Sequence, residues 1–439
     1  MSFFGPISPP VLNQASTPII RRALHRARVV GNFAIVQGIV QVIGFLSGIL
    51  LIRHLDQREY AYFTIANTMQ GTLNTLADIG ISVGLVSIGG RVWQDRYRFG
   101  QLVTTASHLR RKLGAISALL ITPILCLMLI KNGAPIPYTL VLIVLVLAGL
   151  SVQLALGVLG VVPRLLSDIR RIQTIDLSGA VVRLLVLVAL MFLFLNSAVA
   201  VAVGSATLFL QYWMLRRYAR RVIDLDAPEN EEDRTAMQRF IRKLAANAVF
   251  FCFQGQITIF LIGFFGRNIN SVAEVGALGR LAMVFTVLTH LLTNVFGPAF
   301  ARCQDPRRLR WQYAAIVGAV TGFSVLLVAS AVLFPGAFLF VLGGKYAHLE
   351  RELVLMVSGA VVGALTGTFW TLNASKAWIA GSWLYIPLTL AAQIALIPVT
   401  DFSSVRSVLM FNLLSAVPNL LLNLALSFRG FATLRVKEA

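Results

Sequence analysis

Residues 42–52 read VIGFLSGILLI, and residues 53–63 read RHLDQREYAYF. The first stretch carries no charged side chain, whereas the second opens with arginine, histidine, aspartate and glutamate and then turns apolar again. Charged groups are costly inside a bilayer and collect where a spanning helix leaves it. The two stretches therefore predict the end of one membrane-spanning helix, a polar corner, and the start of the next helix.

The composition extends this prediction to the whole chain. Of its 439 residues, 57% are hydrophobic and 13% are charged, and the mean hydropathy is +0.79. A soluble domain of this size would need more charge to cover its surface. About 20 apolar residues cross the ~30 Å hydrocarbon core as a helix. Twelve segments fit this template, near 30–52, 62–90, 113–131, 137–162, 174–195, 197–215, 244–265, 274–300, 312–334, 353–375, 380–399 and 405–428. We expect an all-α polytopic membrane protein.

The net charge of +20 is explained by topology. Of the 38 Lys and Arg, 29 fall in the N-terminal arm, the even-numbered loops and the C-terminal tail, whereas the odd-numbered loops hold 7. This asymmetry follows the positive-inside rule and predicts a multi-pass inner (plasma) membrane protein with both termini cytoplasmic. Nucleic-acid binding is disfavoured.

The longest polar interval divides the chain into two halves. We expect a cytoplasmic N-terminal arm (1–29), an N lobe of six spans (30–215), a cytoplasmic loop between the lobes (216–243), a C lobe of six spans (244–428) and a cytoplasmic tail (429–439). Because each half holds an even number of spans, related halves would be parallel pseudo-repeats about an axis along the membrane normal, around a central cavity.

The polar corner at 53–63 has a counterpart in the second half. Arg53 aligns with Arg267, and Glu59 aligns with Glu274, in RNINSVAEVG (267–276). Each arginine closes the first span of its half, and each glutamate opens the next span. We interpret these four residues as an equivalent structural corner of each lobe.

Polar side chains form stripes inside the early helices of both halves. Asn67, Asn74 and Asp78 share one helical face of the second span, and His290 and Asn294 lie in its partner, the eighth. Single polar residues in spanning helices usually bond to a neighbouring helix. Stripes at matching places predict instead that these residues line a hydrated cavity between two lobes.

Two arginines inside spans are the strongest candidates for binding substrate. Arg183 lies roughly 12 Å into the fifth span, at 1.5 Å per residue, and Arg280 lies near the outer part of the eighth. A charge at this depth costs ~3 kcal/mol or more. Asp176 lies on the same face, seven residues before Arg183, so a structural ion pair is the alternative to a substrate phosphate.

Nothing in the sequence predicts an enzyme, a metal site or a cofactor. The chain lacks GxSxG, HExxH and Walker A motifs. Its three cysteines, Cys126, Cys252 and Cys303, are scattered and have no metal-ligand spacing.

Three stretches resemble the signatures of a transporter family. EYAYF (59–63), LADIGIS (76–82) and FLFVLGGKYAH (338–348) are similar to motifs of the polysaccharide transporters, the O-antigen type oligosaccharide flippases. Their superfamily also contains the multidrug-and-toxin extrusion transporters. Ala61 stands where the family usually has glycine, and Lys345 where an acidic residue is common.

The resemblance implies a flippase or exporter of cell-surface polysaccharide biosynthesis, working by alternating access in the inner membrane. Its substrate would be a polyprenyl-diphosphate-linked glycan carried in membrane lipid, with the polymerase and glycosyltransferases of the pathway as further partners. Arginine suits the diphosphate because its guanidinium binds phosphate bidentately and stays charged.

Two other functions stay open. A cation-coupled exporter of small molecules, of the multidrug-and-toxin extrusion type, would favour an acidic, aromatic-lined cavity. An integral membrane glycan polymerase or ligase would normally show a large periplasmic loop, and the odd-numbered loops here are short.

Overall fold

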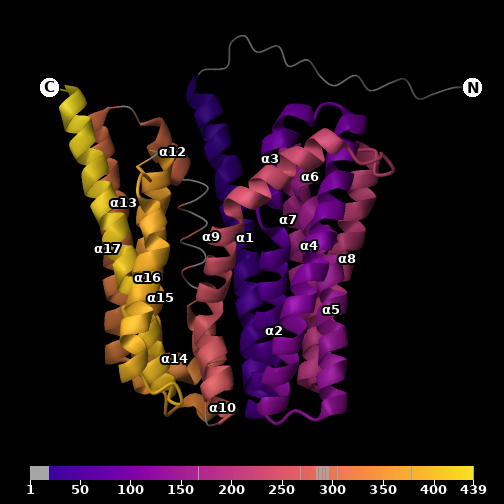
Figure 1. Ribbon diagram of the computed structural model, residues 1–439, viewed down its shortest axis with the longest axis vertical. Helices are drawn as coiled ribbons and strands as arrows, with labels where there is room; N and C mark the ends of the chain where they lie inside the picture. The colour runs from indigo at the N-terminus through magenta and orange to yellow at the C-terminus, as the bar shows by residue number, and fades with distance from the viewer. Residues whose placement is uncertain are drawn as a thin grey trace, which may run out of the picture.

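A computed structural model describes residues 19–438, except 167, 267, 283–284, 286–288, 290–291, 293–295, 304 and 377. Its described elements are helices throughout, and they run nearly parallel along the long axis (Figure 1). The first half holds α1 (Ile19–His54), α2 (Gln57–Asp78), α3 (Ile81–Val92), α4 (Arg96–Lys131), α5 (Ile136–Leu159), α6 (Val161–Leu165), α7 (Ile169–Met191) and α8 (Ser197–Val222).

The second half begins with α9, which bends near its upper end in Figure 1, and ends at the C-terminus. It holds α9 (Glu231–Phe265), α10 (Asn270–Leu281), α12 (Gly297–Arg302), α13 (Pro306–Leu333), α14 (Pro335–Leu342), α15 (Glu350–Ser375), α16 (Tyr385–Leu396) and α17 (Val405–Glu438), with 3₁₀ turns at Gly344–Tyr346, Ser382–Leu384 and Ile397–Val399. We call α1–α8 the N lobe and α9–α17 the C lobe; α9 lies along the seam between them.

Ten of the described helices are long and apolar enough to cross a membrane, and α2 with α3 forms one further, bent candidate. The expected eighth span, 274–300, falls partly outside the described residues. Its flanking helices α10 and α12 lie at opposite ends of the molecule, and both described chain ends lie at the same end (Figure 1). The all-α polytopic fold is therefore as the sequence predicts.

The expected second span is broken rather than continuous. The axes of α2 and α3 differ by 45°, and Gly80 between them has a positive φ of 72°, a conformation that glycine adopts without steric cost. A Cβ at Gly80 would also lie 3.0 Å from the carbonyl oxygen of Phe240 on α9. Gly80, the glycine of the LADIGIS stretch, thus ends α2 and allows α9 to pack closely against the backbone at this point.

The expected loop between the lobes is mostly helical. Because α8 runs to Val222 and α9 begins at Glu231, only 223–230 connects them as a loop. Asn230 caps α9 by accepting hydrogen bonds from the amides of Glu232 and Asp233. Asp233 then pairs with Arg98 of α4, at 2.5 and 2.8 Å. The start of α9 is therefore fixed to the N lobe.

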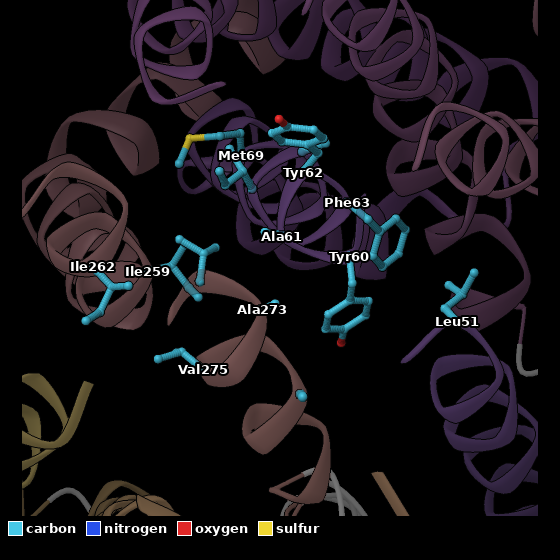
Figure 2. Close-up of a cluster of buried hydrophobic side chains, with 14 of the residues drawn as sticks. Leu51, Tyr60, Ala61, Tyr62, Phe63, Met69, Ile259, Ile262, Ala273 and Val275 are labelled. Carbon is cyan, nitrogen blue, oxygen red and sulfur yellow. The ribbon is translucent and has the colours of Figure 1, made fainter. Parts of the chain in front are cut away.

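A large buried cluster joins the lobes at the end opposite the termini. Figure 2 shows Tyr60 and Phe63 of α2 on one side and Ala273 and Val275 of α10 on the other. All four are at most 7% exposed, and Ala273 is fully buried. The EYAYF stretch and its counterpart in the second half therefore pack against each other across the seam.

Candidate functional site: a polar cavity with two arginines

A cavity of about 550 Å³ lies among α1, α2, α5, α7 and α8 of the N lobe. Its lining is rich in amides, with one carboxylate and one guanidinium: Gln37, Gln41, Asn67, Gln70, Gln153, Gln211, Asp176 and Arg183. Amides both donate and accept hydrogen bonds, so the cavity suits a polar, hydroxyl-rich ligand. Gln153 and Gln211 were not among the predicted lining residues, although glutamines inside apolar segments are a visible signal.

Arg183 points a partly unsatisfied guanidinium into this cavity. Its Nε is buried and has no hydrogen-bond partner in the described part of the chain, and no ion pair with a described carboxylate is formed. A buried donor left unpaired costs roughly 1–3 kcal/mol. The Asp176 carboxylate, two helical turns away on α7, interacts instead with the charge of Arg164 on α6. The structural Asp176–Arg183 pair is therefore absent.

Arg280 reaches the same region from the other lobe. Its charge acts on Arg183, its guanidinium carbon lies 6.0 Å from the centre of the Phe63 ring, and it lies close to Tyr60. Gly48 of α1 leaves room for it, because a Cβ there would already lie 3.4 Å from Arg280 Cδ. The structure thus brings together the two arginines that the sequence singled out.

Two predicted cavity residues lie elsewhere. Asn74 and Asp78 face Arg110 of α4, which donates to Asn74 Oδ1 at 3.1 Å and lies 3.2 Å from Asp78 Oδ1. Arg110 is only 4% exposed, and Gly157 of α5 makes space for it, since a Cβ there would lie 2.0 Å from Arg110 Nη1. Sequence reasoning counted Arg110 as a loop cation and missed this buried pair.

Of the other predicted site residues, Asn67 lines the cavity. His290, Asn294 and Arg267 lie outside the described residues.

The corner glutamates make comparable contacts in the two lobes. Glu59 Oε2 accepts hydrogen bonds from the Tyr138 hydroxyl and the Ser197 amide, both at 2.7 Å, at the starts of α5 and α8. Glu274 lies 3.2 Å from His348 Nε2, just before α15. Tyr138 lies at the start of the fourth expected span and His348 just before the tenth, and these are the matching spans of the two halves.

Basic side chains hold the lobes together beside these corners. Arg53, at the end of α1, donates to the carbonyls of Phe340 and Val341 at the end of α14, at 2.7 and 3.1 Å. In return, Lys345 donates to the carbonyls of Leu55 and Arg53, at 2.9 and 3.4 Å. Cations are stabilised at helix C-termini. We call Arg53 and Lys345 the interlobe latch.

Tyr346 closes the same end of the molecule. It is fully buried beside the latch, and its hydroxyl has no hydrogen-bond partner among the described residues. Burial raises the pKa of Tyr346, with the nearby Tyr60 and Glu274 acting in the same direction. The residue is therefore a neutral side chain buried beside the latch.

No protein-family model matches the chain, and no curated protein matches its sequence. Solved structures do share its fold. An inward-facing multidrug resistance MATE family transporter of the MOP superfamily aligns with a TM-score of 0.67 and 14% identity, over 92% of this chain and 100% of that one. A eukaryotic MATE transporter, AtDTX14, aligns with a TM-score of 0.59 and 14% identity, over 95% of this chain and 99% of that one.

An outward-facing structure of a MATE family transporter aligns less well, with a TM-score of 0.57 and 15% identity, over 91% of this chain and 94% of that one. These alignments confirm the predicted two-lobe fold and show that it is the fold of MATE transporters of the MOP superfamily.

Proposed function

We propose that this chain exports a phosphate-bearing polar glycan on a lipid carrier, by alternating access, and that Arg183 and Arg280 hold the phosphate. The observation that carries the proposal is that Arg280 reaches from the C lobe to Gly48 and Phe63, beside the cavity that Arg183 lines. Neither arginine forms an ion pair with a carboxylate of the described residues. Like charges repel, and more strongly where water is scarce. An anion between the arginines turns this repulsion into two attractions.

Phosphate satisfies the geometry as well as the charge. Arginine presents parallel N–H donors that match two phosphate oxygens, and Arg183 Nε is a buried donor that lacks a partner. A diphosphate offers oxygens on both sides and could bridge the lobes. The amide-lined cavity then accommodates the hydroxyl groups of the glycan, while the lipid tail stays in the bilayer.

Bridging also supplies a transport mechanism. Because Arg183 belongs to the N lobe and Arg280 to the C lobe, bound phosphate couples the relative position of the lobes to the presence of substrate. Export requires the interlobe latch and the buried cluster at that end to separate while the cavity closes at the end of the termini. On this proposal the latch faces the periplasm and the termini face the cytoplasm of the inner membrane.

A second candidate is a cation-coupled exporter of small molecules. The solved structures favour this candidate, because two of them are multidrug resistance transporters. They fit a small-molecule exporter better than a glycan flippase. It is also favoured by Asp176, a carboxylate in the cavity. In this case Asp176 would bind the coupling cation or a cationic substrate, and Arg183 and Arg280 would balance the charge of the Asp176 carboxylate.

Reconstitution into liposomes separates the two candidates. The wild-type protein and the variants Arg280→Gln and Asp176→Asn are supplied with a fluorescent polyprenyl-diphosphate oligosaccharide or with a cationic dye. The glycan proposal expects movement of the oligosaccharide, its loss in Arg280→Gln and its retention in Asp176→Asn. Movement of the dye alone, abolished in Asp176→Asn, would establish the second candidate instead.

A further inference from the structure

A second basic cavity lies on the N lobe, away from the polar cavity. It has a volume of about 210 Å³ and lies between α4 and α8 near their charged ends, at the end of the molecule where the termini lie (Figure 1). Helix α5 separates the two cavities, since it presents Gln153 to the first and Ala155 and Leu159 to the second. The second cavity therefore has no part in the site described above.

Its walls are two stripes at helical spacing. Helix α4 contributes Thr104, Ser107, His108 and Arg111, at steps of three, one and three, and α8 contributes Tyr212, Arg216 and Arg220, at steps of four. Each stripe occupies one face of its helix, so the two faces are turned toward the same space. We call Arg111, Arg216 and Arg220 the arginine cup.

The cup carries unneutralised charge. None of its three arginines forms an ion pair with a carboxylate in the part of the chain that the structure describes. Asp226 stands at the rim, and Glu229 is engaged by His108.

One contact orients a cup arginine and another fixes the end of its helix. Arg216 lies over the Tyr212 ring at 5.8 Å, and Arg96 donates to the Arg220 carbonyl at 3.1 Å, which fixes the end of α8. The three arginines thus line one cavity between α4 and α8.

The cavity also has apolar lining. Val103, Ala155, Leu159 and Leu225 share it with the arginines. Basic and apolar side chains in one cavity, at the edge of the spanning segments, match a molecule with a phosphate head and a hydrocarbon body. Basic pockets of this kind between spanning helices bind the headgroups of anionic lipids.

We propose that the arginine cup binds the phosphate group of an anionic phospholipid. The guanidinium groups of Arg216 and Arg220 contact the phosphate oxygens, and the apolar side chains of the same cavity contact the start of an acyl chain. This site does not depend on the proposed transport function. Soluble phosphate has the same recognition chemistry and is the other source of ligand that the experiment must separate.

The test uses the purified full-length protein in detergent, with binding measured by native mass spectrometry. Phosphatidylglycerol, phosphatidylcholine and inorganic phosphate are titrated into the wild type and two double variants, Arg216→Gln/Arg220→Gln and Arg217→Gln/Arg221→Gln. The second is a matched control, because it removes the same charge from an exposed neighbouring face of α8.

We expect the wild type to bind phosphatidylglycerol more tightly than phosphatidylcholine. The cup variant should lower the affinity for phosphatidylglycerol by roughly 10- to 30-fold, and the control variant by less than about 3-fold. If the wild type binds inorganic phosphate and the cup variant does not, the arginine cup recognises phosphate as proposed, but its ligand is a soluble phosphate. Equal losses in both double variants, or no preference of the wild type for either anion, would overturn the proposal.

Discussion

At the scale of single residues, two arginines in the N lobe differ in what surrounds them. Arg110 is paired with Asp78 and bonded to Asn74, although its Nε and Nη1 also lack a hydrogen-bond partner in the described part of the chain. Arg183 has a buried donor without a partner, no ion pair with a described carboxylate, and a second arginine nearby. A buried ion pair serves the fold, and removing one partner is costly. A cation in a cavity without a carboxylate partner is instead suited to bind an anion.

For Arg183, we expect Arg183→Ala to lower transport of a phosphate-bearing substrate by about 10- to 100-fold, which corresponds to the loss of one or two charge-assisted hydrogen bonds. Protein level should stay near that of the wild type. Arg183→Lys should restore transport only in part, because an ammonium group lacks the bidentate fork. The measurement is transport in the liposome assay, normalised to protein level.

The double variant Arg183→Ala/Asp176→Ala is the control for a structural role. If the double variant recovers the transport that Arg183→Ala has lost, Arg183 acts through Asp176. The proposal that Arg183 binds phosphate is then wrong.

For Arg110, the two partners should respond unequally. Asp78→Ala strands a guanidinium that is 4% exposed, whereas Arg110→Met strands a carboxylate that is 33% exposed and can reach water. We expect Asp78→Ala to lower the free energy of unfolding by about 3–5 kcal/mol, and Arg110→Met by less than half as much. Thermal unfolding in detergent measures both, and the double variant should recover most of the loss. Equal effects of the two single changes would contradict this account.

At the scale of elements, the contact between α2 and α10 sets how closely the lobes approach. Gly276 of α10 lies against Thr64 of α2, and a Cβ at Gly276 would lie 2.5 Å from Thr64 Oγ1 and 2.7 Å from Thr64 Cγ2. Thr64 itself is turned back on its helix by a 2.8 Å hydrogen bond to the Tyr60 carbonyl. The absence of a side chain at Gly276 therefore allows the latch end to close.

We expect Gly276→Ala to shift the protein toward a state that is open at the latch end. Spin labels at Arg58 and Asn268, which line one cavity between the lobes, should report a longer distance by pulsed electron resonance. Gly279→Ala is the matched control, since a Cβ there would meet only Met356 Cε, at 3.7 Å. Adding Thr64→Ala to Gly276→Ala should restore the short distance, and failure to do so would refute the steric explanation.

At the scale of the whole molecule, the orientation in the membrane follows from the side on which the termini and the 223–230 loop lie. Figure 1 shows the described chain ends at the same end as the junction of α8 and α9. The surplus of Lys and Arg in the segments at this end predicts that it faces the cytoplasm.

In a variant without Cys126, Cys252 and Cys303, we expect Pro135→Cys to react with a membrane-impermeant maleimide on intact cells. Pro228→Cys should react only after the cells are permeabilised. Both prolines are exposed and precede helices at opposite ends of the molecule. Direct labelling of Pro228→Cys would reverse the orientation and exclude the proposed direction of export.

The sequence by itself determined the class of protein, the division into two halves and the position of the corner at 53–63. These properties depend on local composition, because a bilayer demands long apolar helices and sorts cations to one side. Depth alone also identified Arg183 and Arg280 as unusual, since a charge is costly at any place within a span.

Only the tertiary structure decided which polar residues meet. Helical spacing places Asn67, Asn74 and Asp78 on one face. In the structure Asn67 lines the cavity, whereas Asn74 and Asp78, nearer the end of α2, contact Arg110 of α4. The approach of Arg183 to Arg280 depends on how two lobes pack, which no local pattern encodes. Periodicity predicts a face, and the neighbouring helix determines what that face contacts.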